Sequence, residues 1–209
     1  MDIIQIVSNK CAISLATKVT NDKFPSIEDQ VEVYQYGFQV ILGGIVKAIL
    51  LISIASILGI LSTVLILALT FSSLRIIAGG IHLKTFLMCV IVSLLFFVGG
   101  ALIVQYTYQY WTYINIYCLL IFSTLMALYI IIRYVPRDTP NKPITEQIQI
   151  NKFKRWSLFY MLGWTVLMIT FLLLNIKIIV IASCFGLLLE LFSISRLGYS
   201  TYELLNLKE

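Results

Sequence analysis

Charged side chains are scarce in this sequence of 209 residues. Aspartate, glutamate, lysine and arginine make up only 12% of the chain, whereas 60% of the residues are hydrophobic. Both values lie far from those of ordinary globular domains, so we predict an integral membrane protein. The formal net charge of +5 has to lie mostly in loops, where it indicates membrane orientation and not nucleic-acid binding.

The sequence also has few of the residues that build metal sites and disulfide frameworks. It has one histidine, and its four cysteines show no CxxC spacing, so we expect no zinc site, no disulfide framework and no cofactor. A secretory signal is not expected either, because "MDIIQIVSNK" begins with an acidic residue and polar side chains interrupt its apolar run. The mature chain is predicted to start at Met1.

Long apolar runs dominate the rest of the chain, and a membrane span needs about 20 such residues. The stretch 38–74 is too long for one upright helix, since its residues at about 1.5 Å each would extend roughly 55 Å. We read it as two spans that turn near Gly59, the second one short. Four further runs lie near 84–105, 112–132, 156–174 and 176–195. The predicted fold is therefore an all-α polytopic membrane protein with about six transmembrane helices.

The positions of the basic residues support this number of spans. If the N-terminus is cytoplasmic, thirteen of the fifteen lysines and arginines fall on the cytoplasmic side, Lys177 falls outside and Lys47 lies within the first span. A five-span chain would break this separation. We therefore predict that both termini are cytoplasmic.

The whole chain, residues 1–209, is expected to form a single membrane domain. Its first part, 1–35, is predicted to be an amphipathic region at the inner membrane surface, followed by a six-span bundle over 36–195 and a cytoplasmic tail over 196–209. Ser26 is a suitable N-cap for a helix that runs into the first span. Apolar residues recur at helical spacing in the first part at Ile4, Val7, Cys11, Leu15 and Val19.

The scarce reactive residues gather in one stretch, "RIIAGGIHLKTFLMC" (75–89). Residues 75–84 are expected to form a cytoplasmic connection, with Cys89 just inside the third span. Histidine and cysteine together make a nucleophile at neutral pH, because the imidazole takes the thiol proton. Seven residues of continuous helix would separate His82 from Cys89 by about 10.5 Å, too far for a hydrogen bond. We therefore predict that the helix starts after His82 and that Gly79 and Gly80 bend the chain. Two glycines make a bend easy and leave the backbone open to a substrate.

Packing roles compete with this interpretation. A single cysteine in an apolar helix usually behaves as a small hydrophobic residue, and a lone histidine at a membrane surface is usually an interfacial polar group. Taken separately, neither residue indicates catalysis. Their occurrence together beside two glycines is what favours it, whereas Cys11, Cys118 and Cys184 have no nearby base and are read as packing residues.

Three motifs resemble the accessory gene regulator B (AgrB) family of membrane cysteine endopeptidases, which process quorum-sensing peptide precursors. The pattern "RIIAGGIH" with a cysteine seven residues after the histidine is similar to that of the family. So is the proline-rich "PRDTPNKPI" (136–144) and, more weakly, "YQYGFQVILGG" (34–44). Length, span number and a basic cytoplasmic side agree with the family, so the resemblance covers nearly the whole chain.

The resemblance implies that Cys89 is the nucleophile and His82 the general base. It implies an AgrD-like precursor as substrate, cut between its core and its acidic tail, and closed into a thiolactone through a thioester on Cys89. Residues expected to contact the substrate are Arg75, Gly79, Gly80 and Lys142. The implied location is the bacterial cell membrane, with the lipid bilayer as surroundings and a homodimer as the assembly.

Other classes fit the same composition. A small multi-span transporter also has several spans, glycine bends and charges inside the membrane, and a non-catalytic scaffold is a third alternative. Two such charges stand out, Glu190 in the sixth span and Lys47 in the first, and each is costly without a partner or a polar cavity. The sequence leaves three arrangements open: Glu190 pairs with Lys47, approaches the catalytic site, or snorkels to the inner end of its span.

Overall fold

The computed structural model describes residues 3–19, 26–80, 85–137 and 146–206. Within these residues the regular structure is helical, apart from one isolated parallel bridge between Gly79 and Arg137, so the all-α prediction is confirmed. Six helices, α2 to α7, are long and apolar enough to cross a membrane. The bounds are α1 (Ile3–Ala16), α2 (Ile27–Ile57), α3 (Leu61–Ala78), α4 (Phe86–Thr107), the 3₁₀ turn η1 (Tyr108–Tyr110), α5 (Tyr113–Tyr134), α6 (Gln147–Leu173), α7 (Lys177–Ile194) and α8 (Arg196–Asn206).

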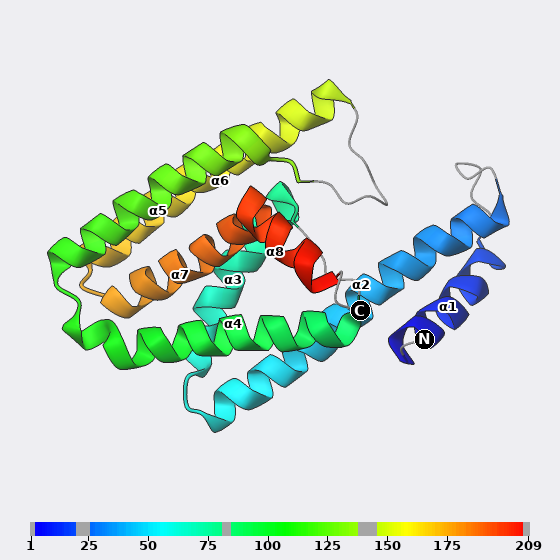
Figure 1. Ribbon diagram of the computed structural model, residues 1–209, viewed down its shortest axis with the longest axis horizontal. Helices are drawn as coiled ribbons and strands as arrows, with labels where there is room; N and C mark the ends of the chain where they lie inside the picture. Colours follow the sequence, from blue (N-terminus) through cyan, green and yellow to red (C-terminus); the bar gives the residue numbers. More distant parts are fainter. Residues whose placement is uncertain (1–2, 20–25, 81–84, 138–145, 207–209) are drawn as a thin grey trace. The chain divides into compact units, whose positions relative to one another are not determined.

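The chain divides into two compact units, residues 1–54 and 55–209. In the first unit α1 lies beside the first half of α2 (Figure 1), and Gln30 Nε2 donates a hydrogen bond of 2.5 Å to the carbonyl oxygen of Val19. The helix α2 starts directly after Ser26, as predicted. The Ser26 hydroxyl oxygen accepts a hydrogen bond of 3.1 Å from the Asp29 backbone N–H, which satisfies one free donor of the first turn.

The two sides of α1 differ in exposure. Its buried residues are small and recur every four positions, at Ser8, Ala12 and Ala16, whereas apolar Val7 and Leu15 are exposed. Close packing therefore uses the small side chains and leaves larger apolar ones uncovered. That this exposed side lies along the inner membrane surface stays a prediction.

The long stretch 38–74 does form two helices. They are separated at Gly59, which has φ +67°, a backbone conformation that glycine adopts without a steric penalty. The predicted tail, 196–209, begins with α8. The helix α6 begins at Gln147, before the apolar run near 156–174, because a helix can continue beyond the apolar run into a polar surface segment.

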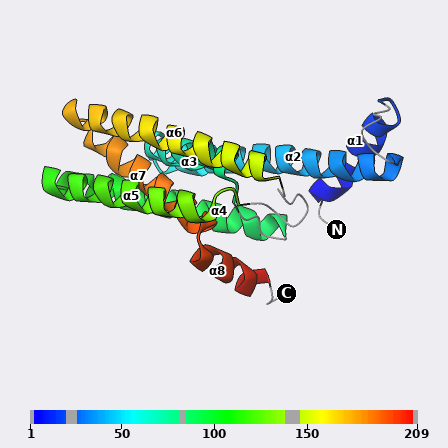
Figure 2. The same ribbon diagram turned by 90° about the horizontal axis from the view of Figure 1, so that it is seen from above.

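The second unit is arranged around α7, which packs against α3, α4, α5, α6 and α8 (Figures 1 and 2). In the most apolar stretch of α7, 61% of the residues are buried inside the protein, compared with 17% in that of α4. Polar groups hold the centre of the unit, because the Ser183 hydroxyl lies 2.8 Å from the Thr70 hydroxyl and accepts a 2.8 Å bond from Trp164 Nε1. Gly186 allows α3 to approach, since a Cβ there would collide with the Leu67 carbonyl oxygen.

Candidate functional site

Arg75 lies in the last turn of α3 and joins it to α7. We predicted this residue in a connection, but the helix continues to Ala78, and a basic residue is favoured in its last turn by the helix dipole. Arg75 Nη1 lies 3.3 Å from Glu190 Oε2 and donates a hydrogen bond of 3.2 Å to the Ser193 hydroxyl oxygen. Ser193 in turn donates a 3.0 Å bond to Glu190 Oε2. These three side chains form the ion-pair cluster.

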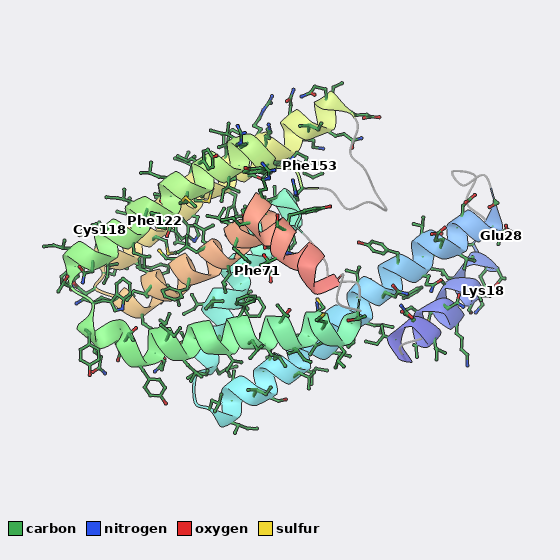
Figure 3. The ribbon with its side chains drawn as sticks, viewed as in Figure 1. Lys18, Glu28, Phe71, Cys118, Phe122 and Phe153 are labelled. Carbon is green, nitrogen blue, oxygen red and sulfur yellow. The ribbon has the colours of Figure 1, made fainter. Side chains whose placement is uncertain are left out.

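The ion-pair cluster is largely shielded from solvent. The Glu190 side chain is 0% exposed and that of Arg75 is 20% exposed. The second carboxylate oxygen of Glu190, Oε1, has no hydrogen-bond partner among the described residues. The centre of the Phe71 ring, labelled in Figure 3, lies 5.4 Å from the Arg75 guanidinium carbon, close enough for a cation–π contact. Among the described residues, Arg75 and Ser193 are therefore the groups that compensate the buried Glu190 carboxylate.

Gly79 and Gly80 bend the chain directly after α3, as predicted. Both have positive φ, +80° and +151°. A Cβ on Gly79 would collide with the carbonyl oxygen of Arg137, whose backbone N–H donates a 2.9 Å bond to the Ala78 carbonyl oxygen. A Cβ on Gly80 would lie 2.6 Å from Arg75 Nη1. Gly79 is therefore required by neighbouring backbone and by its positive φ, and Gly80 by its positive φ beside the Arg75 and Ser193 side chains. Contact of either glycine with a substrate stays a prediction.

Arg137 connects this bend to the C-terminal helix. Its backbone pairs with the bend, and its guanidinium carbon lies 4.6 Å from the centre of the Tyr199 ring in α8. Gly198 permits the close approach of α8 to α7, because a Cβ there would collide with the Phe192 carbonyl oxygen. The end of α3, the segment after α5 and α8 thus meet at one place.

Cys89 lies in the first turn of α4, which begins at Phe86. Its backbone N–H donates a 3.1 Å bond to the Thr85 carbonyl oxygen, and the residue is partly exposed. The prediction that the helix starts after His82 is confirmed. Thr85, which precedes this first turn, is a residue type common at helix N-termini and has an extended backbone, but its side chain makes no capping hydrogen bond.

Two predicted site residues, His82 and Lys142, lie outside the described residues. The contact between His82 and Cys89 therefore stays a prediction, as do the substrate contacts of Lys142. In the described part of the chain, histidine, cysteine, aspartate and glutamate form no group of three that could hold a metal ion.

The pairing of Glu190 with Arg75 was not predicted. Of the three arrangements left open for Glu190, snorkelling is excluded because the side chain is fully buried. The partner lies 115 residues earlier in the chain. Only the packing of α3 against α7 brings the two together, and apolar helices of this kind carry little information about which neighbours they contact.

A second polar cluster lies at the opposite end of α7. Lys177 Nζ donates a 3.3 Å bond to the Trp111 carbonyl oxygen and lies 4.1 Å from the centre of the Tyr113 ring. The Tyr113 hydroxyl donates a 2.6 Å bond to Asn175 Oδ1. This lysine is held by aromatic and carbonyl groups, and no acidic partner is seen among the described residues.

Comparison with known proteins agrees with the family resemblance seen in the sequence motifs. The family model described as Accessory gene regulator B matches residues 8–194, most of the chain. The chain belongs to the accessory gene regulator B family. The match includes α3, the two glycines, Cys89 and Glu190, so the ion-pair cluster and the bend are parts of an AgrB-family domain.

Individual relatives agree with the family assignment. The chain is 39% identical over 109 residues to the accessory gene regulator protein B of Staphylococcus intermedius, covering 52% of this chain and 54% of that protein. It thus spans about half the length of that relative. It is 31% identical over 133 residues to the Staphylococcus lugdunensis protein of the same name, covering 64% and 67%, and 28% identical over 137 residues to an AgrB-like protein of Clostridium acetobutylicum, covering 66% and 62%. No solved structure matches this chain.

Proposed function

We propose that this protein is a membrane cysteine endopeptidase that removes the C-terminal tail of an AgrD-like precursor and promotes thiolactone formation in quorum sensing. Family membership supports the substrate class. The observation that carries the proposal is the position of Cys89. This partly exposed thiol lies in the first turn of a helix, directly after the connection that contains the sole histidine of the chain.

The proposed reaction uses the two residues in sequence. His82 takes the proton of the Cys89 thiol, and the thiolate attacks the scissile carbonyl carbon. The carbon–nitrogen bond breaks, the imidazolium returns the proton to the leaving amine, and the tail departs. The leader and core remain joined to Cys89 as a thioester.

Ring closure requires no further energy source. A cysteine thiol within the precursor core attacks the thioester, its proton passes to the Cys89 thiolate through His82, and one thioester replaces another. A tethered thiol has a very large effective concentration, which favours this exchange over hydrolysis by water. The product is a thiolactone still attached to its leader.

Basic residues at the start of α6 support binding of an acidic tail. Lys152 and Arg155 are exposed there and Lys154 is half-buried. Complementary charge increases the rate of encounter with an acidic peptide. Arg75 already has an internal partner in Glu190, so we assign tail attraction chiefly to the α6 residues.

A small transporter is the second candidate, and the ion-pair cluster is the observation that favours it, since charges buried between spans often mark transport pathways. The two functions make opposite predictions for Cys89. A transporter without peptidase activity tolerates Cys89→Ser, whereas a peptidase loses nearly all cleavage because a hydroxyl without thiolate character is a poor nucleophile.

The test is a cleavage assay with purified protein in liposomes and a synthetic AgrD-like precursor. Wild type is compared with Cys89→Ala, Cys89→Ser and His82→Ala, and release of the acidic tail is followed by mass spectrometry. We expect tail release by wild type alone. Equal release by Cys89→Ala would refute the peptidase assignment.

A further inference from the structure

The ion-pair cluster lies directly against the start of the reactive connection. A Cβ on Gly80 would lie 2.6 Å from Arg75 Nη1 and 3.0 Å from the Ser193 hydroxyl oxygen. Glu190 Oε2 bonds both of these groups. The backbone at Gly80 therefore lies close against the two side chains that hydrogen-bond to Glu190.

Both ends of this contact are fixed by buried helix packing. Arg75 is anchored in α3, and Glu190 and Ser193 are anchored in α7, the most buried of the candidate spans in its unit. A carboxylate with two directed partners restricts their side-chain rotamers, which is how supporting residues keep a reactive group in a productive geometry. His82 follows Gly80 by two residues, so a fixed Gly80 limits the positions from which the imidazole can reach Cys89.

We propose that Glu190 is a positioning residue of the cysteine peptidase: acting through Arg75 and Ser193, it fixes the start of the α3–α4 connection that carries the general base. This inference rests on the proposed function. Glu190 itself contacts neither the substrate nor the thiol in this account. Its effect is transmitted by the guanidinium and hydroxyl groups under Gly80.

Positioning and simple structural support predict different kinetics. Loss of a positioning group lowers kcat and leaves KM nearly unchanged, because substrate still binds but the base is misplaced. A displacement of about 1 Å costs on the order of 100-fold in rate. We therefore expect Glu190→Leu to lower kcat by about 10- to 100-fold and Glu190→Gln, which keeps an oxygen acceptor for Arg75, to lower it by less.

Two serines of α7 provide a matched pair for the test. Ser193 belongs to the ion-pair cluster, and Ser183 bonds Thr70 and Trp164 at the centre of the unit; each is 1% exposed. Both Ser→Ala variants remove a buried hydroxyl from the same helix. Only Ser193→Ala is expected to lower kcat, by about three- to tenfold, less than the loss of the whole carboxylate.

The experiment measures kcat and KM for precursor cleavage in liposomes for wild type, Cys89→Ala and the four variants above. A second readout is the iodoacetamide alkylation rate of Cys89, followed site by site by mass spectrometry, because a misplaced base generates less thiolate. The inference predicts lower kcat, unchanged KM and slower alkylation for Glu190→Leu, Glu190→Gln and Ser193→Ala. Ser183→Ala should match wild type in all three.

The outcomes distinguish this inference from the proposed function. Folded Glu190 and Ser193 variants that match Ser183→Ala in kcat and alkylation would overturn the positioning role, while the Cys89-dependent activity would stand. If Glu190→Leu fails to fold, Glu190→Gln and Ser193→Ala decide the question by the same criteria. Equal cleavage by wild type and Cys89→Ala would overturn the proposed function, and the positioning role with it.

Discussion

The two ends of α7 each hold a basic side chain, but they do so by different means. At one end Arg75 pairs with the fully buried Glu190 beside a turn of two glycines with positive φ. At the other end Lys177 rests on the Tyr113 ring and a backbone carbonyl oxygen. A buried charge must be paired, whereas a lysine among interfacial aromatic groups can exchange its contacts for water. The first end is therefore built to hold one geometry, and the second tolerates change.

The largest difference is expected between the thiols near these two ends. Cys89 follows the connection that leaves the Arg75 end, whereas Cys118 is an exposed thiol in the second turn of α5, the helix that starts at Tyr113. Figure 3 shows Cys118 far from Phe71. We predict that Cys89→Ala lowers the precursor cleavage rate by at least about 1000-fold, because the nucleophile is lost. Cys118→Ala should cleave at the wild-type rate in the same liposome assay. A similar loss in both variants would contradict the assignment.

The next largest effect concerns stability. Arg75→Leu leaves the Glu190 carboxylate buried without its ionic partner, and we predict that the free energy of unfolding falls by about 3 kcal/mol. The measurement is a denaturant titration in mixed micelles. Arg75→Leu with Glu190→Leu in the same chain should recover part of the loss, since the uncompensated charge is then absent. A double variant no more stable than Arg75→Leu would show that the pair is not the cause.

A smaller effect is expected for the glycine turn. Gly80→Ala introduces a Cβ against Arg75 and Ser193 at a positive φ, and we predict a loss of roughly 2 kcal/mol in stability together with reduced cleavage. Gly59→Ala is the matched control, because Gly59 also has positive φ but no atom within 4 Å of the added Cβ. It should cost about 1 kcal/mol from backbone strain and leave cleavage unchanged. Equal cleavage by both variants would argue against tight packing at Gly80.

The smallest effect is expected at the other end. Lys177→Met removes the cation–π contact with Tyr113 and the bond to Trp111 but leaves no buried charge. We predict a loss below about 1 kcal/mol in the same unfolding titration, with precursor cleavage unchanged. A loss as large as that of Arg75→Leu would remove the distinction between the two ends.

The sequence predicted the parts of this fold that depend on local chemistry. Gly59 marked the turn between two spans, Ser26 marked the start of α2, and the Gly79–Gly80 pair marked the bend before α4. Each of these signals acts within a few residues of itself, so no knowledge of tertiary packing is needed to interpret it.

The sequence could not predict which helices pack together. Arg75 was expected in a loop facing a substrate, and Glu190 was given three alternative environments, because their contact depends on the packing of α3 against α7. Apolar spans of similar composition do not specify their neighbours through hydropathy alone. For the same reason, the sequence did not predict the bond between Arg75 and Ser193 or the backbone contact between Gly79 and Arg137. Each of these contacts joins segments more than 50 residues apart.

The most direct test of the central claim is the intact mass of the protein after brief incubation with an AgrD-like precursor whose internal cysteine is replaced by serine. Without the ring-closing thiol, the acyl group should accumulate on the enzyme. The account predicts an added mass equal to leader plus core, located on Cys89, removed by hydroxylamine and absent in Cys89→Ala. Tail release by wild type with no such adduct in either protein would contradict a thioester on Cys89.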